Sequence, residues 1–305
     1  MKVAVTGASG FIGSALAGSL AGDGHEVVRM VRREPSGPDE RRWDPSGASS
    51  ADLSGVDAVV HLAGAGIGDR PWTPRYRRTL LLSRVQGTAT IARAVAEAGV
   101  PVLVSGSAIG FYGDTGDREA DEDSPNGTGF LANLARAWED AARPAAQAGA
   151  RVAFARTGHV LDPGGGLLGK LLPLYRVGLG GRLGSGHQYW SWISLADEVA
   201  ALRFLIDEEV SGPVNLAAPN PVTNAEFTHA LGVAVHRPTP LPVPAFALRM
   251  ALPGFAREAI LPGQRVVPRR LAEAGFRFAD PELGAALPRI FKNTPPDDRR
   301  PYRDR

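Results

Sequence analysis

The stretch Thr6-Gly-Ala-Ser-Gly-Phe-Ile-Gly13 decides the fold, because it follows a short apolar run, Val3-Ala-Val-Thr6, and leads into an Ala/Leu-rich segment. A strand that enters a helix through glycines at this spacing is the dinucleotide-binding fingerprint. Gly7 permits the tight turn, Gly10 lets the backbone approach a pyrophosphate, and Gly13 allows close packing of helix on strand. The alternative is a plain glycine-rich turn. The pattern predicts a phosphate-binding loop whose contacting residues are Thr6, Gly7, Ser9, Gly10, Phe11, Ile12 and Gly13.

Strand-like and helix-like segments alternate after this loop. Strands are expected at 25–31, 57–63, 100–104 and 151–157, and helices at 11–21, 79–98 and 130–148. The alternation favours an α/β architecture, a doubly wound parallel (Rossmann) sheet covered by helices on both faces. After Gly158 the chain becomes glycine-rich and then proline-rich, which favours a second, smaller α/β capping domain. The expected boundaries are 1–160 with 196–220 for the Rossmann domain, 161–195 with 221–291 for the cap, and 292–305 for a disordered tail.

Composition excludes several classes of protein. The 305 residues include no cysteine, which excludes a disulfide scaffold, a thiolate nucleophile and a cysteine-based metal site. No spacing of His, Asp or Glu suggests a metal either. No apolar run reaches the length of about 18 residues that a membrane span needs, and no signal peptide precedes the first strand. We therefore expect a cytoplasmic protein without a membrane partner.

Net charge argues against a nucleic-acid partner. The formal charge is +2, and the segment from Lys292 to Arg305 carries five basic and three acidic residues, which accounts for the whole excess. The rest of the chain is neutral in sum, whereas phosphate-backbone binding needs clustered Lys and Arg on the folded body. The expected partners are a small-molecule substrate and, as an open alternative, a second copy in a homodimer.

Two arginines at the end of the second strand indicate the cofactor. An NAD site usually carries Asp or Glu about 20 residues after the glycine loop, where it binds the ribose 2′-hydroxyl. Here residues 30–33 are Met, Val, Arg and Arg, so Arg32 and Arg33 occupy that place and the first carboxylate after them is Glu34. A guanidinium suits a 2′-phosphate through its bidentate fork. The pattern predicts NADP(H); the alternative is a pair of solvated arginines at a strand end.

The order of motifs resembles a known superfamily. TGASGFIG at 6–13, HLAG at 61–64, VQGT at 85–88 and SGSAIGFYG at 105–113 are similar to the extended short-chain dehydrogenase/reductases, which include sugar-nucleotide epimerases and dehydratases. RTGHVL at 156–161, GLGGRLGSGHQYWSWI at 178–193 and LPGQRVVPRRLAEAGFRF at 261–278 resemble the atypical "epimerase family protein" subgroup, which has its own C-terminal domain. The resemblance implies NADP binding and a Rossmann domain with a small cap. Further cofactor contacts are then expected from Leu62, Ala63, Gly64, Arg84 and Ser105.

The chain departs from the superfamily at its catalytic pair. The resemblance implies a Tyr-x-x-x-Lys motif on the helix after the serine-bearing strand, in which Tyr exchanges the proton and Lys lowers the pKa of that Tyr. Phe130 stands where Tyr is expected, and Leu134 where Lys is expected. Neither side chain transfers a proton, which puts the usual ketone/alcohol mechanism in doubt.

Other polar residues are candidates for the missing proton donor. Ser107 best matches the superfamily's catalytic Ser/Thr, Tyr112 follows in the same loop, and His187 has an intrinsic pKa near neutrality. Asp114, Glu119 and Glu122 either overhang the site or are solvated. The aromatic, glycine-rich cap sequence predicts a substrate pocket, with a packed domain hinge as the alternative. The expected pocket residues are Arg156, His159, Gln188, Trp190 and Trp192.

Two function classes follow from these residues. The first is an NADP(H)-binding oxidoreductase or isomerase of the epimerase–dehydratase type, acting on a small polar molecule. The second is a catalytically silent NADP-binding regulator or scaffold, which the loss of both Tyr and Lys favours. The glycine-lined aromatic cap argues for the first, because a pure sensor does not need a second pocket.

Overall fold

The computed structural model describes residues 1–47 and 51–293, in two compact units. Unit 1 comprises Met1–Ala108, Asn133–Arg156 and Val199–Val214, and unit 2 comprises Ile109–Ala132, Thr157–Glu198 and the described residues from Asn215 onward. The segment Ile109–Ala132 groups with unit 2, although the sequence analysis assigns it to the Rossmann domain. The domain boundaries therefore stay a prediction, and most of the expected tail, 294–305, lies outside the described residues.

A seven-stranded sheet runs in the order β11-β7-β5-β4-β1-β2-β3. Its strands are β1 (Lys2–Thr6), β2 (Glu26–Val31), β3 (Glu40–Arg42), β4 (Ala58–His61), β5 (Val102–Ala108), β7 (Arg151–Thr157) and β11 (Gly212–Leu216). Strand β1 pairs in parallel with β2 on one side and β4 on the other, so the winding reverses at β1. The predicted α/β class is confirmed. Ligands of such sheets bind at the carboxyl ends of the strands where the winding reverses.

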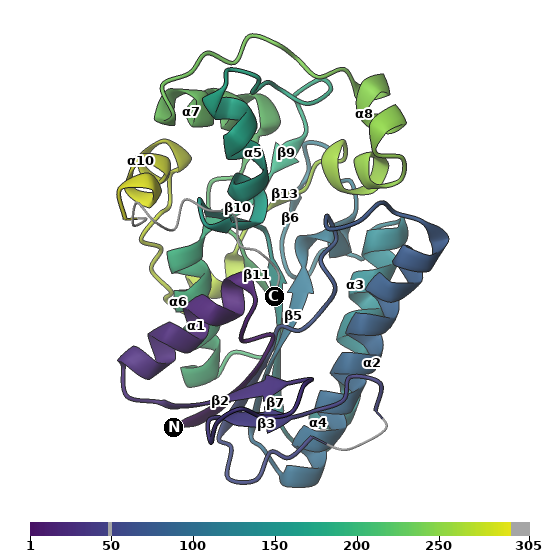
Figure 1. The fold of residues 1–305 in the computed structure, drawn as a ribbon, viewed down its shortest axis with the longest axis vertical. Coiled ribbons are helices and arrows are strands. Elements are labelled where there is room, and N and C mark those ends of the chain that lie inside the picture. The colour runs from purple at the N-terminus through teal and green to yellow at the C-terminus, as the bar shows by residue number, and fades with distance from the viewer. Residues whose placement is uncertain (48–50, 294–305) are drawn as a thin grey trace. The chain divides into compact units, whose positions relative to one another are not determined.

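Helices cover the sheet of unit 1. Helix α1 (Phe11–Gly22) lies on the face opposite α2 (Pro74–Ala98) and α4 (Arg143–Gln147), and α6 (Leu195–Asp207) lies beside α1 (Figure 1). Helix α2 begins five residues before the predicted start, because Thr73 caps it and Pro74 suits the first helical position. The predicted helix 130–148 is divided into α3 (Phe130–Asp140) and α4, with Pro144 in the first turn of α4.

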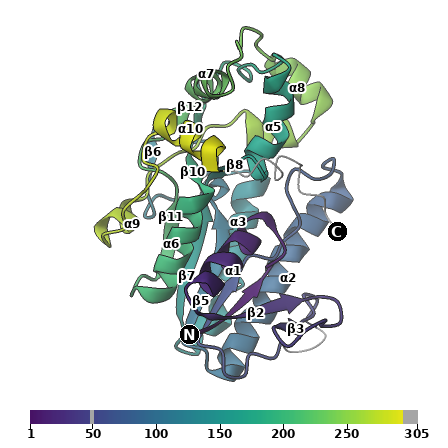
Figure 2. The same ribbon diagram turned by 60° about the vertical axis from the view of Figure 1, so that its left-hand side comes forward.

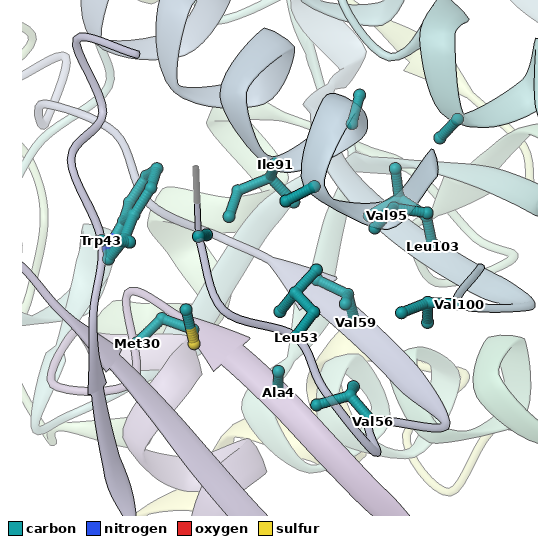
Figure 3. Packing of buried hydrophobic residues seen from close by; sticks show 14 of the residues in the cluster. Ala4, Met30, Trp43, Leu53, Val56, Val59, Ile91, Val95, Val100 and Leu103 are labelled. Atoms are coloured by element: carbon teal, nitrogen blue, oxygen red, sulfur yellow. The ribbon is translucent and has the colours of Figure 1, made fainter. Parts of the chain in front are cut away.

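The core of unit 1 fills the space between the sheet and α2. Ile91 and Val95 of α2 lie against Val59 and Leu103 of the two central strands, and all four side chains are fully buried (Figure 3). The α2 residues are four apart, so they occupy one face of the helix. This packing fixes the positions of β4 and β5, and therefore also those of the loops at their carboxyl ends.

Unit 2 consists of short strand pairs and short helices. Its strands pair as β6 (Glu119–Ala120) with β13 (Arg265–Val266), β8 (His159–Asp162) with β10 (Trp192–Ser194), and β9 (Tyr189–Trp190) with β12 (Val222–Thr223). Its helices are η1 (Ile109–Tyr112), α5 (Gly166–Arg176), α7 (Asn224–Ala234), α8 (Ala245–Ala251), the π-helical turn η2 (Ala256–Ile260), α9 (Arg269–Glu273) and α10 (Leu283–Asn293). Helix α10 packs on α7 (Figure 2). Helix α5 was not expected, because the glycines around its start obscure the helical pattern.

Candidate functional site

The N-terminus of α1 is left without a side-chain cap. Its N-cap is Gly10, which has no side chain to bond the first-turn N–H groups, and the first turn holds no acidic residue. By contrast, the hydroxyl of Thr73 caps α2, and Thr223 with Glu226 forms a capping box on α7. The N–H groups and positive dipole end of α1 therefore remain free to bind an anion.

The glycines of the loop are required by close backbone contacts. Gly7 has a φ of +69°, a left-handed conformation that side chains rarely adopt. A Cβ on Gly13 would overlap the carbonyl oxygen of Gly7. The Gly10 N–H donates to that same oxygen at 2.8 Å and closes the turn. The loop is therefore a tight turn that leads directly into the N-terminus of α1. The fingerprint predicts that a pyrophosphate binds at this helix start.

Thr6 and His61 join the ends of β1 and β4. The Thr6 hydroxyl oxygen accepts the N–H groups of Leu62 and Ala63 at 3.1 and 3.2 Å. It lies 2.8 Å from His61 Nδ1, to which it therefore donates its own proton. Burial lowers the pKa of His61 to about 3, so the ring is neutral. Its role is to fix the loop 62–63 rather than to exchange protons.

Helix α2 holds the next part of the same loop. Arg84 Nη1 donates to the Ala65 carbonyl at 2.9 Å, and the Tyr76 hydroxyl donates to the Gly66 carbonyl at 2.5 Å. The Arg84 guanidinium also lies over the Trp138 ring at 4.9 Å. Burial lowers the pKa of Arg84 to about 10, which leaves it charged at neutral pH. Among the described residues its Nη2 has no hydrogen-bond partner, so a cation faces the loop predicted to hold cofactor.

The two arginines after β2 differ in their partners. Arg33 is paired in bidentate fashion with Glu40, through Nη1 at 2.7 Å and Nη2 at 2.5 Å. This pairing lowers the pKa of Glu40 to about 2. Arg32 is exposed and has no ion pair or hydrogen bond within the part of the chain that the structure describes. Arg32 is therefore the guanidinium available to a ligand.

The hydroxyl of Ser107 is held by an ion pair. It donates to Glu139 Oε1 at 2.6 Å. Arg156 binds both oxygens of the same carboxylate, Nε to Oε1 and Nη2 to Oε2, each at 2.8 Å. The side chain of Glu139 is 11% exposed and that of Arg156 is 4% exposed. Two predicted site residues, Ser107 and Arg156, are thus brought together by Glu139, which the sequence analysis did not single out.

The remaining hydroxyls and the atypical pair are also packed. The Tyr112 hydroxyl donates to Asn215 Oδ1 at 2.7 Å in the interior of unit 2. Ser105 is fully buried, and its hydroxyl lies 3.4 Å from the Gly106 carbonyl. Leu134 is buried and Phe130 is half-buried. Tyr112 and Ser105 therefore have structural contacts, and Phe130 and Leu134 supply no titratable group.

Unit 2 contains a cavity of about 260 Å³ built from two of its sequence motifs. Gly110, Gly113 and Asp114 come from the loop after β5, and Pro262 and Gln264 come from LPGQ. The motifs are clamped together, because Gly263 N–H donates to Asp114 Oδ1 and Gln264 Nε2 donates to the Gly113 carbonyl, both at 3.1 Å. The other lining residues are Thr128, Gly129, Leu131, Ala132, Arg257 and Glu258.

The aromatic residues predicted for a substrate pocket lie elsewhere. Trp190 and Trp192 are buried in the core of unit 2, and His159 contacts the Trp190 ring at 5.2 Å. Burial lowers the pKa of His159 to about 4. Gln188 donates to the Leu183 carbonyl at 2.9 Å, and His187 is exposed. None of these five lines the cavity, so their assignment to a pocket stays a prediction.

One buried carboxyl of unit 2 has no counterpart in the sequence analysis. Glu198 is fully buried, and Thr157 Oγ1 donates to its Oε1 at 2.8 Å. Its Oε2 has no partner among the described residues. Burial raises the pKa of Glu198 to about 8, so the group is mostly a neutral acid at pH 7. The sequence offered no signal for it, because its burial depends on packing far along the chain.

Residues 1–47 and 51–293 contain neither a metal-ligand cluster nor a membrane-spanning helix. No cluster of three His, Asp or Glu side chains is placed to ligate a metal ion. No helix in these ranges combines the length and apolarity needed to cross a membrane.

Comparisons with known proteins agree with this architecture. Residues 3–217 match the NAD dependent epimerase/dehydratase family, and residues 243–290 match a domain of unknown function. The chain is 52% identical to an epimerase family protein of Mycobacterium tuberculosis over 93% of this chain and 96% of the relative. A crystal structure of human epimerase family protein SDR39U1 with NADPH superposes with a TM-score of 0.89 at 38% identity, covering 96% of this chain and all of that one. A nucleoside-diphosphate sugar epimerase of Corynebacterium glutamicum gives a TM-score of 0.77 at 35% identity, covering 98% and 63%. The chain therefore belongs to the NAD dependent epimerase/dehydratase family.

Proposed function

We propose that this protein binds NADP(H) on unit 1 and uses it to oxidise, reduce or isomerise a small polar molecule. The observation that carries the proposal is the guanidinium of Arg32 at the end of β2, which has no partner among the described residues and lies where an NAD-binding protein would place a carboxylate. Arg33 cannot offer the same group without leaving Glu40. The NADPH in the human relative supports the same cofactor.

The residues of unit 1 fit such a dinucleotide. The uncapped first turn of α1 would bind the pyrophosphate through backbone N–H groups. Arg32 would pair with the 2′-phosphate, and Arg84 would present its free Nη2 beside the loop 62–66. When bound, the cofactor supplies hydride transfer. The protein's part is to orient it and to exclude water.

Polar groups at the cavity of unit 2 support a polar substrate. Arg257 is exposed and, among the described residues, makes no ion pair. Glu258 Oε2 accepts the Leu131 N–H at 3.3 Å, and its other oxygen accepts no hydrogen bond within the described residues. A molecule with both an acidic group and hydroxyl donors would satisfy Arg257, Glu258 and Asp114 together.

A silent NADP-binding regulator is the second candidate function. It is favoured by the hydrogen bond that commits the Ser107 hydroxyl to Glu139, and by Phe130 and Leu134 at the positions of the usual acid and its partner. A structure of the NADP complex separates the two functions. A polar side chain within about 3.5 Å of the ligand position beside the nicotinamide supports turnover. A wholly apolar surround there would assign the protein to regulation.

Thermal unfolding with NADPH and with NADH tests the choice of cofactor. A ligand that binds only the folded state raises the melting temperature, and at a given concentration the rise is larger for the ligand with the smaller dissociation constant. We expect a clear rise with NADPH and a much smaller one with NADH at equal concentration. Equal rises would remove the role given to Arg32.

A further inference from the structure

Unit 2 exposes large apolar side chains along one part of its sequence. Leu174, Val177, Leu179, Leu241, Phe246 and Met250 are between 49% and 78% exposed. In the described part of unit 2, every exposed large apolar side chain falls between Leu174 and Leu252. Exposed apolar side chains gathered in one region mark an interaction surface, whereas scattered ones need no explanation.

Hydrogen bonds join the two segments of chain that carry these apolar residues. Arg237 Nε donates to the Arg176 carbonyl at 3.0 Å, and Val243 N–H donates to the Arg182 carbonyl at 2.8 Å. A Cβ on Gly181 would overlap the Leu241 carbonyl oxygen, so the two segments are in close backbone contact. We name the surface formed by residues 174–184 and 237–252 the apolar-basic face.

Helix α8 is the most exposed element of this face. It buries none of its seven residues. Phe246 and Met250 are four residues apart and therefore share one side of the helix. Ala245, Ala247 and Leu248 are half-buried, whereas Phe246 and Met250 are exposed. The helix thus presents its largest apolar side chains outward, which is the arrangement of a docking element rather than of a core element.

The same region is strongly basic. Residues 174–184 and 237–252 contain four arginines and no acidic residue, a formal charge of +4 in a chain whose total is +2. Arg176, Arg182, Arg237 and Arg249 are exposed and have no ion pair in the described ranges. The net charge of the whole chain is therefore a poor guide to this region, because acidic residues elsewhere offset its arginines.

We propose that the apolar-basic face docks on the anionic surface of a lipid bilayer. Phe246, Met250 and Leu241 would enter the boundary between headgroups and hydrocarbon, and the arginines would contact anionic headgroups. Leu241 lies in the segment Arg237-Pro-Thr-Pro-Leu-Pro-Val-Pro244, whose four prolines stiffen the chain and remove N–H groups that would lack partners in lipid.

Charge separates this partner from the alternatives. A second copy of the chain would bring two faces of the same sign together, which costs free energy on association. A nucleic acid would satisfy the arginines but would offer no hydrocarbon to Val177, Leu179 or Leu241. Binding of single strands also relies on several exposed aromatic side chains that stack on the bases. Among the described residues of this face, Phe246 is the one exposed aromatic side chain. An anionic bilayer satisfies both the charge and the apolar side chains.

Sedimentation of the full chain with vesicles tests the proposal. We expect the protein to pellet with vesicles of phosphatidylcholine mixed with phosphatidylglycerol, and much less with phosphatidylcholine alone. Raising the ionic strength from about 0.1 M to about 1 M shortens the screening length from about 10 Å to about 3 Å and should weaken the binding. Hydrogen exchange of the wild-type chain on these vesicles should show protection at residues 174–184 and 237–252.

Paired variants locate the contact. Phe246→Ser/Met250→Ser should lower vesicle affinity by about tenfold or more, whereas Ile67→Ser, an exposed apolar residue of unit 1, should leave it unchanged. Arg237→Glu/Arg249→Glu should abolish binding, whereas Arg75→Glu/Arg78→Glu, the same charge change in unit 1, should not.

Three results would overturn the proposal. One is an absence of pelleting and of exchange protection with anionic vesicles. Another is dimerisation in ultracentrifugation that Phe246→Ser/Met250→Ser abolishes without vesicle binding, which assigns the face to a second copy. The third is retention of a single-stranded RNA oligomer by a protein that ignores vesicles, which assigns it to nucleic acid.

Discussion

Two glycine-rich loops follow strands of the same sheet, and they treat their polar groups in opposite ways. In Thr6–Gly13, after β1, the first turn of α1 has no cap and its N–H groups are left for a ligand. In Ser105–Gly113, which comprises the end of β5 and the turn η1, the Ser107 hydroxyl is bound by Glu139 and the Tyr112 hydroxyl by Asn215. We call Thr6–Gly13 the open loop, because its N–H groups are left for a ligand. We call Ser105–Gly113 the closed loop, because its hydroxyls bind other side chains of the protein.

This difference separates cofactor binding from proton transfer. The proposed dinucleotide site has a tight glycine turn and a guanidinium, that of Arg32, which makes no ion pair or hydrogen bond within the described residues. The hydroxyls that would exchange a proton have structural partners, and Phe130 and Leu134 replace the usual acid and its lysine. The proposed cofactor site therefore lacks the acid that the superfamily usually places beside it, and the proposed turnover needs a proton donor from the cavity of unit 2 or from water.

The largest effect is expected from breaking the closed loop at its ion pair. Glu139→Ala leaves the buried Arg156 without its carboxylate, which should cost about 3–5 kcal/mol of unfolding free energy. Asp140→Ala is the matched control, because that carboxylate is half-exposed and pairs with Arg143 at the surface; it should cost less than about 1 kcal/mol. Denaturant titration measures both, and equal losses would show that the Ser107 contact is not built on a buried pair.

The open loop should respond to one added methyl group. Gly13→Ala pushes a Cβ against the Gly7 carbonyl and displaces the backbone that faces the phosphates, so we expect NADPH affinity to fall at least about tenfold. Gly18→Ala is in the same helix with no atom within 4 Å of the added Cβ. It should keep NADPH affinity and raise stability by about 0.5–1 kcal/mol. Unchanged NADPH binding by the Gly13 variant would mean that the loop is only a turn.

The smallest effect is expected at Tyr112. Tyr112→Phe removes the donor to Asn215 and should cost about 1–2 kcal/mol of stability, because a buried acceptor loses its partner, while NADPH affinity is unchanged. Tyr189→Phe, a half-buried tyrosine, should change stability by less than about 0.5 kcal/mol. A stable Tyr112 variant that has lost turnover of an identified substrate would instead make Tyr112 the proton donor.

Features fixed by neighbouring residues could be predicted from the sequence. The strand, the glycine turn and the start of α1 are contiguous, so this strand–turn–helix unit and the α/β class could be predicted from the local pattern alone. Helix α5 could not be predicted in the same way, since glycines surround its first turn. It forms because Leu168, Leu172 and Tyr175 are buried together in the core of unit 2.

Features fixed by distant partners could not be predicted. Ser107 was a candidate catalytic group because of its motif, but the carboxylate that binds it is 32 residues away. Arg32 and Arg33 are equivalent in sequence and differ only because Glu40 on β3 pairs with one of them. Trp190 and Trp192 suggested a pocket by composition, whereas their burial against Phe227 and other apolar residues depends on the whole of unit 2.

Calorimetric titration of NADPH and NADH into the wild-type protein and Arg32→Ala tests the central claim most directly. The account predicts that the wild type binds NADPH at least about tenfold more tightly than NADH, because a guanidinium–phosphate pair forms only with NADPH. It also predicts that Arg32→Ala brings the two dissociation constants together by weakening NADPH alone. Equal affinities in the wild type, or a variant that keeps the preference for NADPH, would contradict it.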